Sequence, residues 1–397
     1  MSEDTGVSVI GDSLEGKRVI LAVSGGIAAT ESVKLARELR RHGAEVFPMM
    51  TKSAEKVITP LALSWGSGID VVTDWESEMS QLGGFDGLIL APATRNTIAK
   101  FVHGILDSPI MMAISAASGS GIPILFVPSM HNDLFQDKVT DDLLSESVNR
   151  GVHIMIEDPQ EGKRKQPDPV EIVAMFCNLV NRSIAGRKRV AITLGANAAP
   201  IDSIRKIVNT SSGNTGWSIA EYLHRMGHDV VCISGITSRK PTFSLPDIRI
   251  AESPDSMLAE SILVANSEKR PEYWVHAAAI LDYSPEPFSG KFPSKSGEWV
   301  ITLKPMVKHL KELKEHTIGS KRIAFKLEVN GLEENLIDKS MDLISENELL
   351  AVVANMLNDV QGETNSRCRI VFSDGKISEI TDINDMCLEI ERIISTH

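Results

Sequence analysis

Apolar residues along the first half of the chain gather in short runs that alternate with longer helical patterns. The runs at 17–25, 86–94 and 122–130 are rich in Val, Ile and Leu, and each ends in small or polar residues. Continuous runs of this length predict strands that are buried on both faces of a parallel sheet. Segment 26–46 between the first two has helical spacing, and we expect its helix to end at Gly43. This pattern predicts an open α/β sheet.

A second series of the same kind begins with the strand pattern GRKRVAITLGA at 186–196. A helix and a strand are expected within 217–235, and further strand patterns lie at 272–284, 322–329 and 349–357. The order of strand, glycine-rich turn and helix again predicts a parallel sheet with helices on both faces. The second half is therefore expected to form its own three-layer α/β domain.

Between the two series, residues 157–171 are rich in charge and proline and show no apolar periodicity. They are expected to form a lid or connector. The helical pattern at 170–186 is expected to close the first domain. We therefore predict an N-terminal extension at 1–16, a first domain at 17–185 and a second domain at 186–397.

Composition narrows the class of protein. The chain has 397 residues, 42% of them hydrophobic and 24% charged, as in an ordinary globular protein. Its formal charge of −12 argues against non-specific binding of nucleic acid. The four cysteines have no CxxC spacing, which indicates neither a zinc site nor a disulfide framework. The acidic start and the absence of a long apolar run predict a cytoplasmic protein without a membrane segment.

Two adjacent strand ends in the first domain carry small and polar residues. Ser24, Gly25 and Gly26 follow the first strand pattern, and Thr94 and Asn96 follow the second. Glycines allow a ligand to approach the backbone, and a helix N-terminus offers free N–H groups to a phosphate. Open α/β sheets bind ligands at such strand ends. The turn is not GxGxxG, and many turns of this kind bind nothing.

The motifs SGGIAATE, TKSA, APATRNTIAK, GILDSP and PSMHND, in this order, resemble those of the flavin-dependent cysteine decarboxylases. The resemblance covers roughly residues 17–175. Those proteins bind FMN and decarboxylate 4′-phosphopantothenoylcysteine, so the resemblance implies a flavodoxin-like or Rossmann-like FMN-binding domain. The implied FMN contacts are Ser24, Gly25, Gly26, Ile27, Thr51, Ser53, Ala93, Thr94 and Asn96.

Two positions depart from that family. Its catalytic His precedes the Asp of DGLILAPAT by eight residues, where this chain has Glu78. The family's substrate-binding Asn corresponds to His131, with Asn132 beside it. A carboxylate at Glu78 would repel the substrate carboxylate, and His131 is an alternative base. Three interpretations stay open: an altered decarboxylase, a flavin-binding relic and a structural domain without cofactor.

The segment IVNTSSGNTGWSIA at 207–220 has an unusually long run of small and polar residues before its helix. Ser211, Ser212 and Gly213 would offer hydroxyl and N–H groups to a phosphate, although a serine-capped turn is the simpler alternative. No GxxxxGK[ST] motif occurs in the chain. Asp282 could recognise an exocyclic amine or hold Mg²⁺, and Lys291 follows in a segment typical of a mobile flap.

These segments resemble the phosphopantothenate–cysteine ligases over roughly residues 187–395. The resemblance implies a Rossmann-like (ribokinase-like) domain that uses CTP, as bacterial and archaeal members do, with Mg²⁺ bridging the phosphates. It assigns catalytic roles to Asn209 and Lys291. The implied nucleotide and substrate contacts are Gly195, Ala196, Asp202, Arg205, Ser211, Ser212, Gly213, Ala277, Ala278, Ala279, Asp282, Phe325 and Lys326, and Asp282 is the expected metal ligand.

The two resemblances together predict a coenzyme A biosynthesis protein that joins 4′-phosphopantothenate to cysteine, with decarboxylation as a second activity. One alternative is a ligase with an inactive flavodomain, and another is a flavin-binding regulatory or scaffold protein. The families also imply a homo-oligomer, with dimers of ligase domains and trimers of flavodomains.

Overall fold

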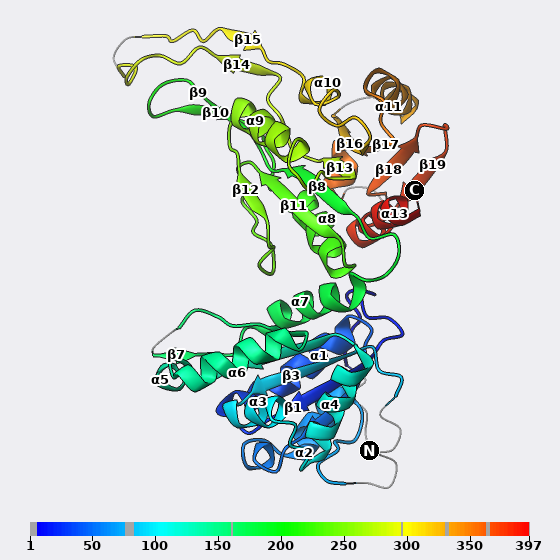
Figure 1. The fold of residues 1–397 in the computed structure, drawn as a ribbon. Coiled ribbons are helices and arrows are strands. Elements are labelled where there is room, and N and C mark those ends of the chain that lie inside the picture. The colour runs from blue at the N-terminus through cyan, green and yellow to red at the C-terminus, as the bar shows by residue number, and fades with distance from the viewer. Residues whose placement is uncertain are drawn as a thin grey trace. The chain divides into compact units, whose positions relative to one another are not determined.

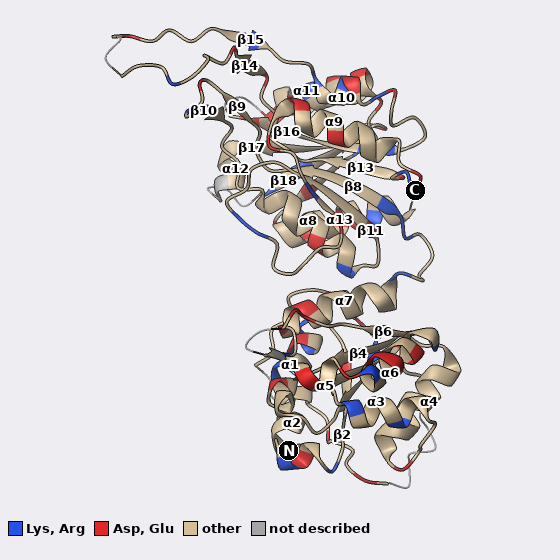
Figure 2. Ribbon diagram, turned by 60° about the vertical axis from the view of Figure 1, so that its left-hand side comes forward, with Lys and Arg blue, Asp and Glu red and all other residues tan. Residues whose placement is uncertain are grey.

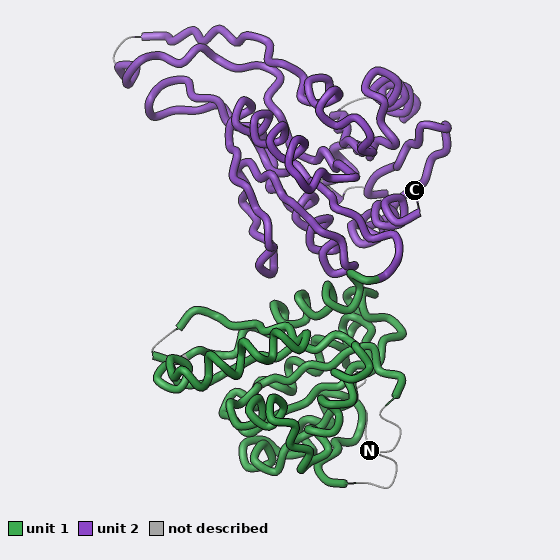
Figure 3. Tube along the Cα trace, viewed as in Figure 1, with its two compact units in different colours: residues 1–183 green, residues 184–397 purple. Residues whose placement is uncertain are grey.

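The computed structural model describes residues 6–75, 83–159, 162–294, 297–329, 333–362 and 366–396. The chain divides into two compact units, Met1–Ser183 and Ile184–His397 (Figure 3). Within the described residues, no helix has the length and apolar character needed to cross a membrane.

The first unit contains a parallel sheet of five strands in the order β2-β1-β3-β4-β6 (Figure 1). The predicted apolar runs form its central strands. In chain order the strands are β1 (Arg18–Val23), β2 (Glu45–Met50), β3 (Gly87–Ala93), β4 (Ile124–Pro128) and β6 (Val152–Ile154).

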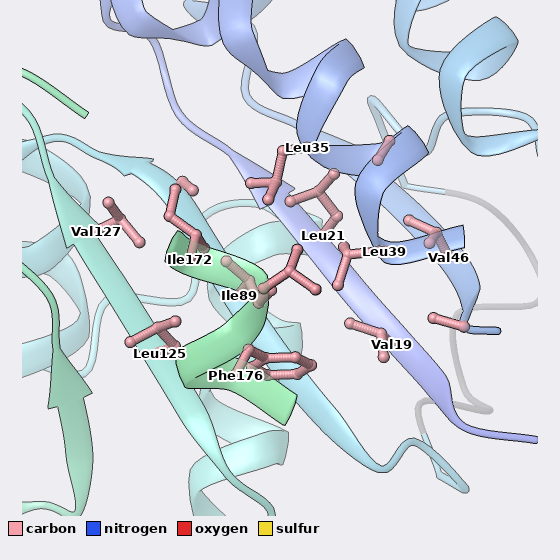
Figure 4. Close-up of a cluster of buried hydrophobic side chains, with 14 of the residues drawn as sticks. Val19, Leu21, Leu35, Leu39, Val46, Ile89, Leu125, Val127, Ile172 and Phe176 are labelled. Atoms are coloured by element: carbon pink, nitrogen blue, oxygen red, sulfur yellow. The ribbon is translucent and has the colours of Figure 1, made fainter. Parts of the chain in front are cut away.

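Side chains of this sheet alternate between two hydrophobic clusters, one on each face. Val19 and Leu21 of β1 pack with Leu35 of α1 (Ser32–Arg41) and Phe176 of α7 (Pro169–Asn181) (Figure 4). The alternate residues along the strands, such as Ile20, point to the other face and pack against helices α3, α4 and α6. These helices span Arg95–Val102, Pro109–Ser120 and Lys138–Asn149.

Several short elements complete this unit. A 3-10 helix η1 (Ile27–Glu31) precedes α1, and η2 (Ala54–Lys56) and α2 (Pro60–Ser67) follow β2. Strand β5 (Met130–His131) pairs with β7 (Lys163–Arg164), and α5 (Asn132–Phe135) follows β5. The expected lid or connector thus contains one short strand. Leu14 near the start of the chain is fully buried in the cluster beneath α1 and α7.

The second unit contains an eight-stranded sheet in the order β12-β11-β8-β13-β16-β17-β18-β19. All neighbours are parallel except at β18 and β19, which run antiparallel. The strands are β8 (Arg189–Leu194), β11 (Asp229–Ser234), β12 (Ile248–Ile250), β13 (Tyr273–His276), β16 (Lys321–Glu328), β17 (Ala351–Met356), β18 (Cys368–Phe372) and β19 (Ile377–Ile380).

Helices α8 (Asn214–Arg225) and α13 (Ile383–Thr396) pack against each other, while α9 (Pro254–Ala265) and α11 (Glu333–Asn347) contribute to the hydrophobic clusters of the sheet. Two short helices, α10 (His309–Glu312) and α12 (Leu357–Gln361), lie in connections. The predicted fold class, two α/β domains built on largely parallel sheets, is confirmed.

Two antiparallel hairpins extend from the second unit beyond its sheet (Figure 1). One pairs β9 (Ala198–Pro200) with β10 (Lys206–Val208), and the other pairs β14 (Tyr283–Pro285) with β15 (Leu303–Pro305). The sequence pattern did not predict either hairpin, because each strand has only three residues.

Candidate functional sites

Ser24 joins the carboxyl ends of β1 and β3 in the first unit. Its hydroxyl lies 2.7 Å from the carbonyl oxygen of Pro92, to which it donates, and it accepts the Thr94 N–H at 2.9 Å. The side chain is fully buried. Ser24 therefore shapes the loop through its hydroxyl, and the whole residue is buried beneath it.

Gly25 lies against the end of β2. A Cβ atom at this position would be 2.2 Å from the Cβ of Ser53 and 2.8 Å from its carbonyl carbon. The N–H of Thr51 donates to Val23 at 3.1 Å, which holds the two strand ends together. Because the close neighbour includes backbone, a larger residue at Gly25 would force the two loops apart.

A cavity of about 410 Å³ opens at these strand ends. Of the residues predicted to contact FMN, it is lined by Gly25, Thr51, Ser53, Thr94 and Asn96. The other four do not line it: Ser24 and Ala93 are buried, Gly26 lies behind Thr94, and Ile27 is 82% exposed. The cavity thus gathers most of the polar residues predicted for this site.

The same cavity is also lined by Lys100, which the sequence placed with Thr94 and Asn96 after the second strand, and by residues that the sequence did not indicate, among them Lys52. Lys52 forms ion pairs with Glu55 and Asp74, at 3.3 and 3.2 Å, and Lys100 pairs with Asp107 at 2.7 Å. Trp75 and Met111 add apolar surface. A cavity of this size, with an indole, hydroxyls and two lysines at a sheet edge, fits a flat cofactor that carries a phosphate.

The residues that depart from the decarboxylase motifs lie in two places. His131 is exposed and pairs with Lys163 in the β5–β7 ladder, and the Asn132 N–H donates to Gly162 at 3.1 Å. Both are thus attached to the segment that the sequence identified as a lid or connector. Glu78 lies outside the described residues.

In the second unit, the ends of β8 and β13 run side by side beyond the sheet. The Ala279 N–H donates to Gly195 at 2.8 Å, and the Asn197 N–H donates to Ala279 at 3.1 Å. A bridge pairs Ala196 with Ala279. The glycine-rich turn and the three alanines at 277–279 were predicted as parts of the site. They are far apart in the sequence, and the structure places them next to each other.

Asn209 joins this junction from the end of β10. Its side-chain nitrogen donates to the carbonyl oxygens of Ala279 and Ile280, at 3.1 and 3.0 Å. Two carbonyl partners fix the orientation of the amide, because its oxygen could not accept from either of them. The amide oxygen of Asn209 is therefore the atom that remains to accept a hydrogen bond from a ligand.

The serine-rich turn before α8 caps the helix with its own side chains. Ser211 Oγ accepts the Gly213 N–H at 3.4 Å, and Ser212 Oγ accepts the Asn214 N–H at 3.3 Å. Gly213 has a φ of 78°, a left-handed conformation that favours glycine. The capping alternative thus describes part of this turn, and the helix N-terminus still offers positive partial charge to an anion.

Arg367 lies at the same helix end and was missed from the sequence. Its Nη2 atom donates to Thr215 Oγ1 in the first turn of α8 at 3.0 Å, and its Nη1 atom is buried with no hydrogen-bond partner. Because β18 is antiparallel to β17, its first residues reach the sheet edge at which the parallel strands end. Only this reversal brings Arg367 to α8, so no local sequence signal identifies it.

The four charged residues predicted to bind nucleotide or substrate, Asp202, Arg205, Asp282 and Lys326, are already paired. Asp282 forms an ion pair with Lys308, and both side chains are well exposed. Lys326 pairs with Glu328 at 3.1 Å, half-buried beside Phe325 on β16. The Asp202 carboxylate is completely buried and pairs with Arg205 at 2.6 Å. Among the described residues, no three His, Cys, Asp or Glu side chains group to hold a metal ion.

Comparison with known proteins finds a different family model for each of the two units. The family model Flavoprotein matches residues 9–181, and the model of the DNA/pantothenate metabolism flavoprotein C-terminal domain matches residues 185–388. The chain is similar to the coenzyme A biosynthesis bifunctional protein CoaBC of Thermococcus kodakarensis, with 35% identity over 89% of this chain and 88% of that protein.

The proteins of the same name from Methanocaldococcus jannaschii and Escherichia coli K12 are also similar. The first is 31% identical over 87% of this chain and 85% of its own length. The second is 30% identical over 91% of this chain and 92% of its own length.

Proposed function

This chain belongs to the family of the coenzyme A biosynthesis bifunctional proteins and is an enzyme of coenzyme A biosynthesis; we propose that its second unit joins 4′-phosphopantothenate to cysteine with CTP. The observation that carries this proposal is the junction of Gly195, Asn209 and Ala279 beyond the parallel strands. It places small residues, an oriented amide and the N-terminus of α8 at one sheet edge, where α/β proteins bind nucleotides.

The proposed reaction has two steps. The carboxylate of 4′-phosphopantothenate attacks the α-phosphorus of CTP, forms an acyl-cytidylate and releases pyrophosphate. The cysteine amine then attacks the acyl carbon, forms the amide and releases CMP. The amide oxygen of Asn209 would accept a hydrogen bond from a hydroxyl or N–H of the acyl group. Lys291, exposed on the β14–β15 hairpin, would stabilise the charge that develops at the phosphate.

The proposal also specifies CTP as the nucleotide and Mg²⁺ as the metal ion bound with it. The alanines at 277–279 leave space for a flat base against the backbone, and Asp282 with Lys308 would lie at its edge. Mg²⁺ is commonly bound through one or two carboxylates and the phosphates of the substrate, so it does not require a cluster of protein ligands. Asp282 would be its protein ligand once the ion pair with Lys308 opens.

For the first unit we propose FMN-dependent decarboxylation of 4′-phosphopantothenoylcysteine. The support is the cavity beside Gly25, Thr51 and Thr94, whose residues fit a flavin with its phosphate. Bound FMN would supply the two-electron oxidation of the substrate thiol that makes loss of CO₂ possible. The protein would hold the cofactor and position the substrate, with His131 and Asn132, which pair with the lid or connector, as candidate substrate contacts. All four cysteines lie in described parts of the chain, are buried and form no disulfide, which is compatible with a reducing cytoplasm.

One assay separates the two activities. The purified chain is incubated with 4′-phosphopantothenate, cysteine, Mg²⁺ and either CTP or ATP, and products are identified by mass. Phosphopantothenoylcysteine alone would support the ligase and contradict an active decarboxylase, whereas 4′-phosphopantetheine would support both. No product with either nucleotide would overturn the ligase proposal. The visible spectrum of the purified protein tests the flavin independently.

We also propose that the second unit forms dimers through its hairpins. Large apolar side chains are exposed along them, including Ile204 at 70% and Val300 at 84%, with charged residues interspersed between them (Figure 2). Exposed apolar patches of this kind mark protein interfaces. Ile27, Leu61 and Trp65 give the first unit a similar surface for the trimer that its family implies. Val300→Asp should halve the molar mass of an isolated ligase domain in light scattering, and an unchanged mass would contradict the dimer.

A further inference from the structure

Lys291 lies between two backbone hydrogen bonds that attach its hairpin to the β9–β10 loop. On one side, the carbonyl oxygen of Gly290 accepts the Ser203 N–H at 3.1 Å. On the other side, the Phe292 N–H donates to Asp202 Oδ2 at 3.1 Å. The side chain of Lys291 is exposed. The backbone of this residue is therefore held on both sides while its ammonium group stays free to move.

Asp202 is the centre of this attachment. Its carboxylate accepts the N–H groups of Ile204 at 2.8 Å and Arg205 at 2.7 Å, in addition to that of Phe292. Burial alone would raise the pKa of Asp202, but these backbone hydrogen bonds and the charge of Arg205 lower it. The carboxylate is thus ionised and completely buried, so its oxygens are already engaged by the protein.

Arg205 adds a second attachment to the same segment. Its Nη1 atom donates to Asp202 at 2.6 Å, and its Nη2 atom lies 3.5 Å from the carbonyl oxygen of Phe292. The guanidinium is 5.3 Å from the ring centre of Trp299, which stacks on Phe292 at 4.0 Å with the ring planes within 3°. Arg205 therefore contacts residues of the hairpin on both sides of its tip.

We infer that Asp202 is a positioning residue for the ligase reaction: it holds the backbone around Lys291 against the β9–β10 loop, which leads to Asn209, before any ligand binds. The inference rests on the proposed role of Lys291 in activation. It differs from the role that the family resemblance implied for Asp202, a direct contact with nucleotide or substrate. We call Asp202, Arg205 and Phe292 the flap anchor.

The physical reason is the cost of positioning a long, flexible lysine. An ammonium group on a freely moving hairpin would have to be ordered in each catalytic cycle, and displacement by about 1 Å can cost on the order of 100-fold in rate. Because the flap anchor orders the backbone around Lys291 when the chain folds, only the side-chain rotamers of Lys291 remain to be ordered during the reaction.

A first experiment measures the order of the hairpin without any assay of activity. Asp202→Asn replaces one carboxylate oxygen, which accepts hydrogen bonds, with an NH₂ group, which donates them. That NH₂ group would face another donor, either the Arg205 guanidinium or the Phe292 N–H. We expect amide exchange in a peptide that contains Phe292, and tryptic cleavage after Lys291, to become at least about tenfold faster in the full-length protein. Glu286→Gln is the matched control, because Glu286 pairs with Lys304 on the exposed surface of the same hairpin. Equal rates in Asp202→Asn and the control would overturn the inference.

A second experiment tests whether Asp202 acts through Lys291. Asp202→Asn should lower kcat of the ligase about tenfold or more with little change in KM for the nucleotide. In a Lys291→Ala background the same substitution should have no further effect, whereas a general structural role would lower kcat by the same factor again. Arg205→Gln, which leaves the backbone hydrogen bonds of Asp202 intact, should show an intermediate loss with the same dependence on Lys291. Independent losses would reject the positioning role.

The two experiments also separate this inference from the proposed function. If the wild-type chain makes no phosphopantothenoylcysteine, the proposed ligase function fails, but hydrogen exchange and proteolysis still report on the flap anchor. If the wild type is active and the hairpin of Asp202→Asn stays protected, only the inference fails.

Discussion

The two candidate sites lie at the same kind of sheet edge but obtain their polar groups in different ways. In the first unit, Ser24, Gly25 and Thr51 are held by hydrogen bonds and close contact between the strand ends themselves. In the second unit, Lys291 is carried by a hairpin that extends away from the sheet. A cofactor that stays bound suits a pocket formed by the core, whereas charge that appears briefly in a reaction suits a long, flexible side chain on an anchored hairpin.

The largest expected effect concerns this hairpin. Lys291→Ala should lower kcat of ligation by about 100-fold or more, because the positive charge at the reacting phosphate is lost. Product formation measured by mass would check this, and the flavin spectrum of the same variant should be unchanged. A loss of less than threefold would show that the hairpin is not part of the catalytic site.

Gly25→Ala should have the opposite effect, loss of the flavin with ligation retained. The added Cβ would lie within 2.2 Å of Ser53, so the cavity should deform and the purified protein should lose its flavin absorbance and any decarboxylation. Ligation should remain. Gly119→Ala is the control, since no atom lies within 4 Å of the Cβ added there. Retained flavin in Gly25→Ala would contradict the placement of the cofactor at these strand ends.

A third prediction concerns the stability of the second unit away from its site. Although burial alone would raise it, hydrogen bonds with His228 and Ser395 and the charge of Arg187 lower the pKa of Glu391 from 4.5 to about 2. A lowered carboxyl pKa stabilises the fold above pH 4.5, and this stability is lost as the pH falls from there towards 2.

Glu391→Gln should therefore lower the free energy of unfolding by about 3 kcal/mol at pH 7, and by much less near pH 3. Urea unfolding at the two pH values would measure this. Glu389→Gln on the same helix is the control, because its partner Arg392 is 72% exposed at 3.6 Å and such pairs contribute at most about 1 kcal/mol. A pH-independent loss in Glu391→Gln would mean that packing, not charge, is responsible.

The smallest effect is expected on the hairpin surface. Lys304→Gln removes the ion pair with Glu286, in which both side chains are more than half exposed. Solvent screens such a pair, so the free energy of unfolding should change by less than about 0.5 kcal/mol and ligation should be unaffected. A larger change in stability would show that the hairpin contributes to the folded state as much as the sheet does.

Much of the architecture was predictable because buried parallel strands leave a strong local signal. The runs that contain β1, β3, β4 and β8 have apolar centres rich in Val, Ile and Leu, and the structure places each of them in a sheet. The expected helix at 26–43 divides into η1 and α1, and the helix expected at 170–186 ends at Asn181. Short strands such as β9 and β14 escaped prediction, because three residues are too few to show a period.

The candidate sites were predictable only as separate motifs. Asn209 and Ala279 each belong to a recognisable stretch, but their hydrogen bond joins residues separated by 70 positions. Arg367 contacts Thr215 across 152 positions, and nothing in its own neighbourhood indicates that contact. The family resemblance implied a ligand contact for Asp202, whereas the structure buries its carboxylate among backbone N–H groups.

By itself, the sequence determined the fold class, the two strand–helix series and the residue types at each strand end, because these depend on local periodicity and on the conformations that glycine and apolar residues favour. Only the tertiary structure decided which polar groups remain available. That depends on which distant donors and acceptors meet: Ser24 with Pro92, Asn209 with Ala279, and Asp202 with Phe292. A polar group already paired within the protein positions its neighbours, and an unpaired one can bind a ligand.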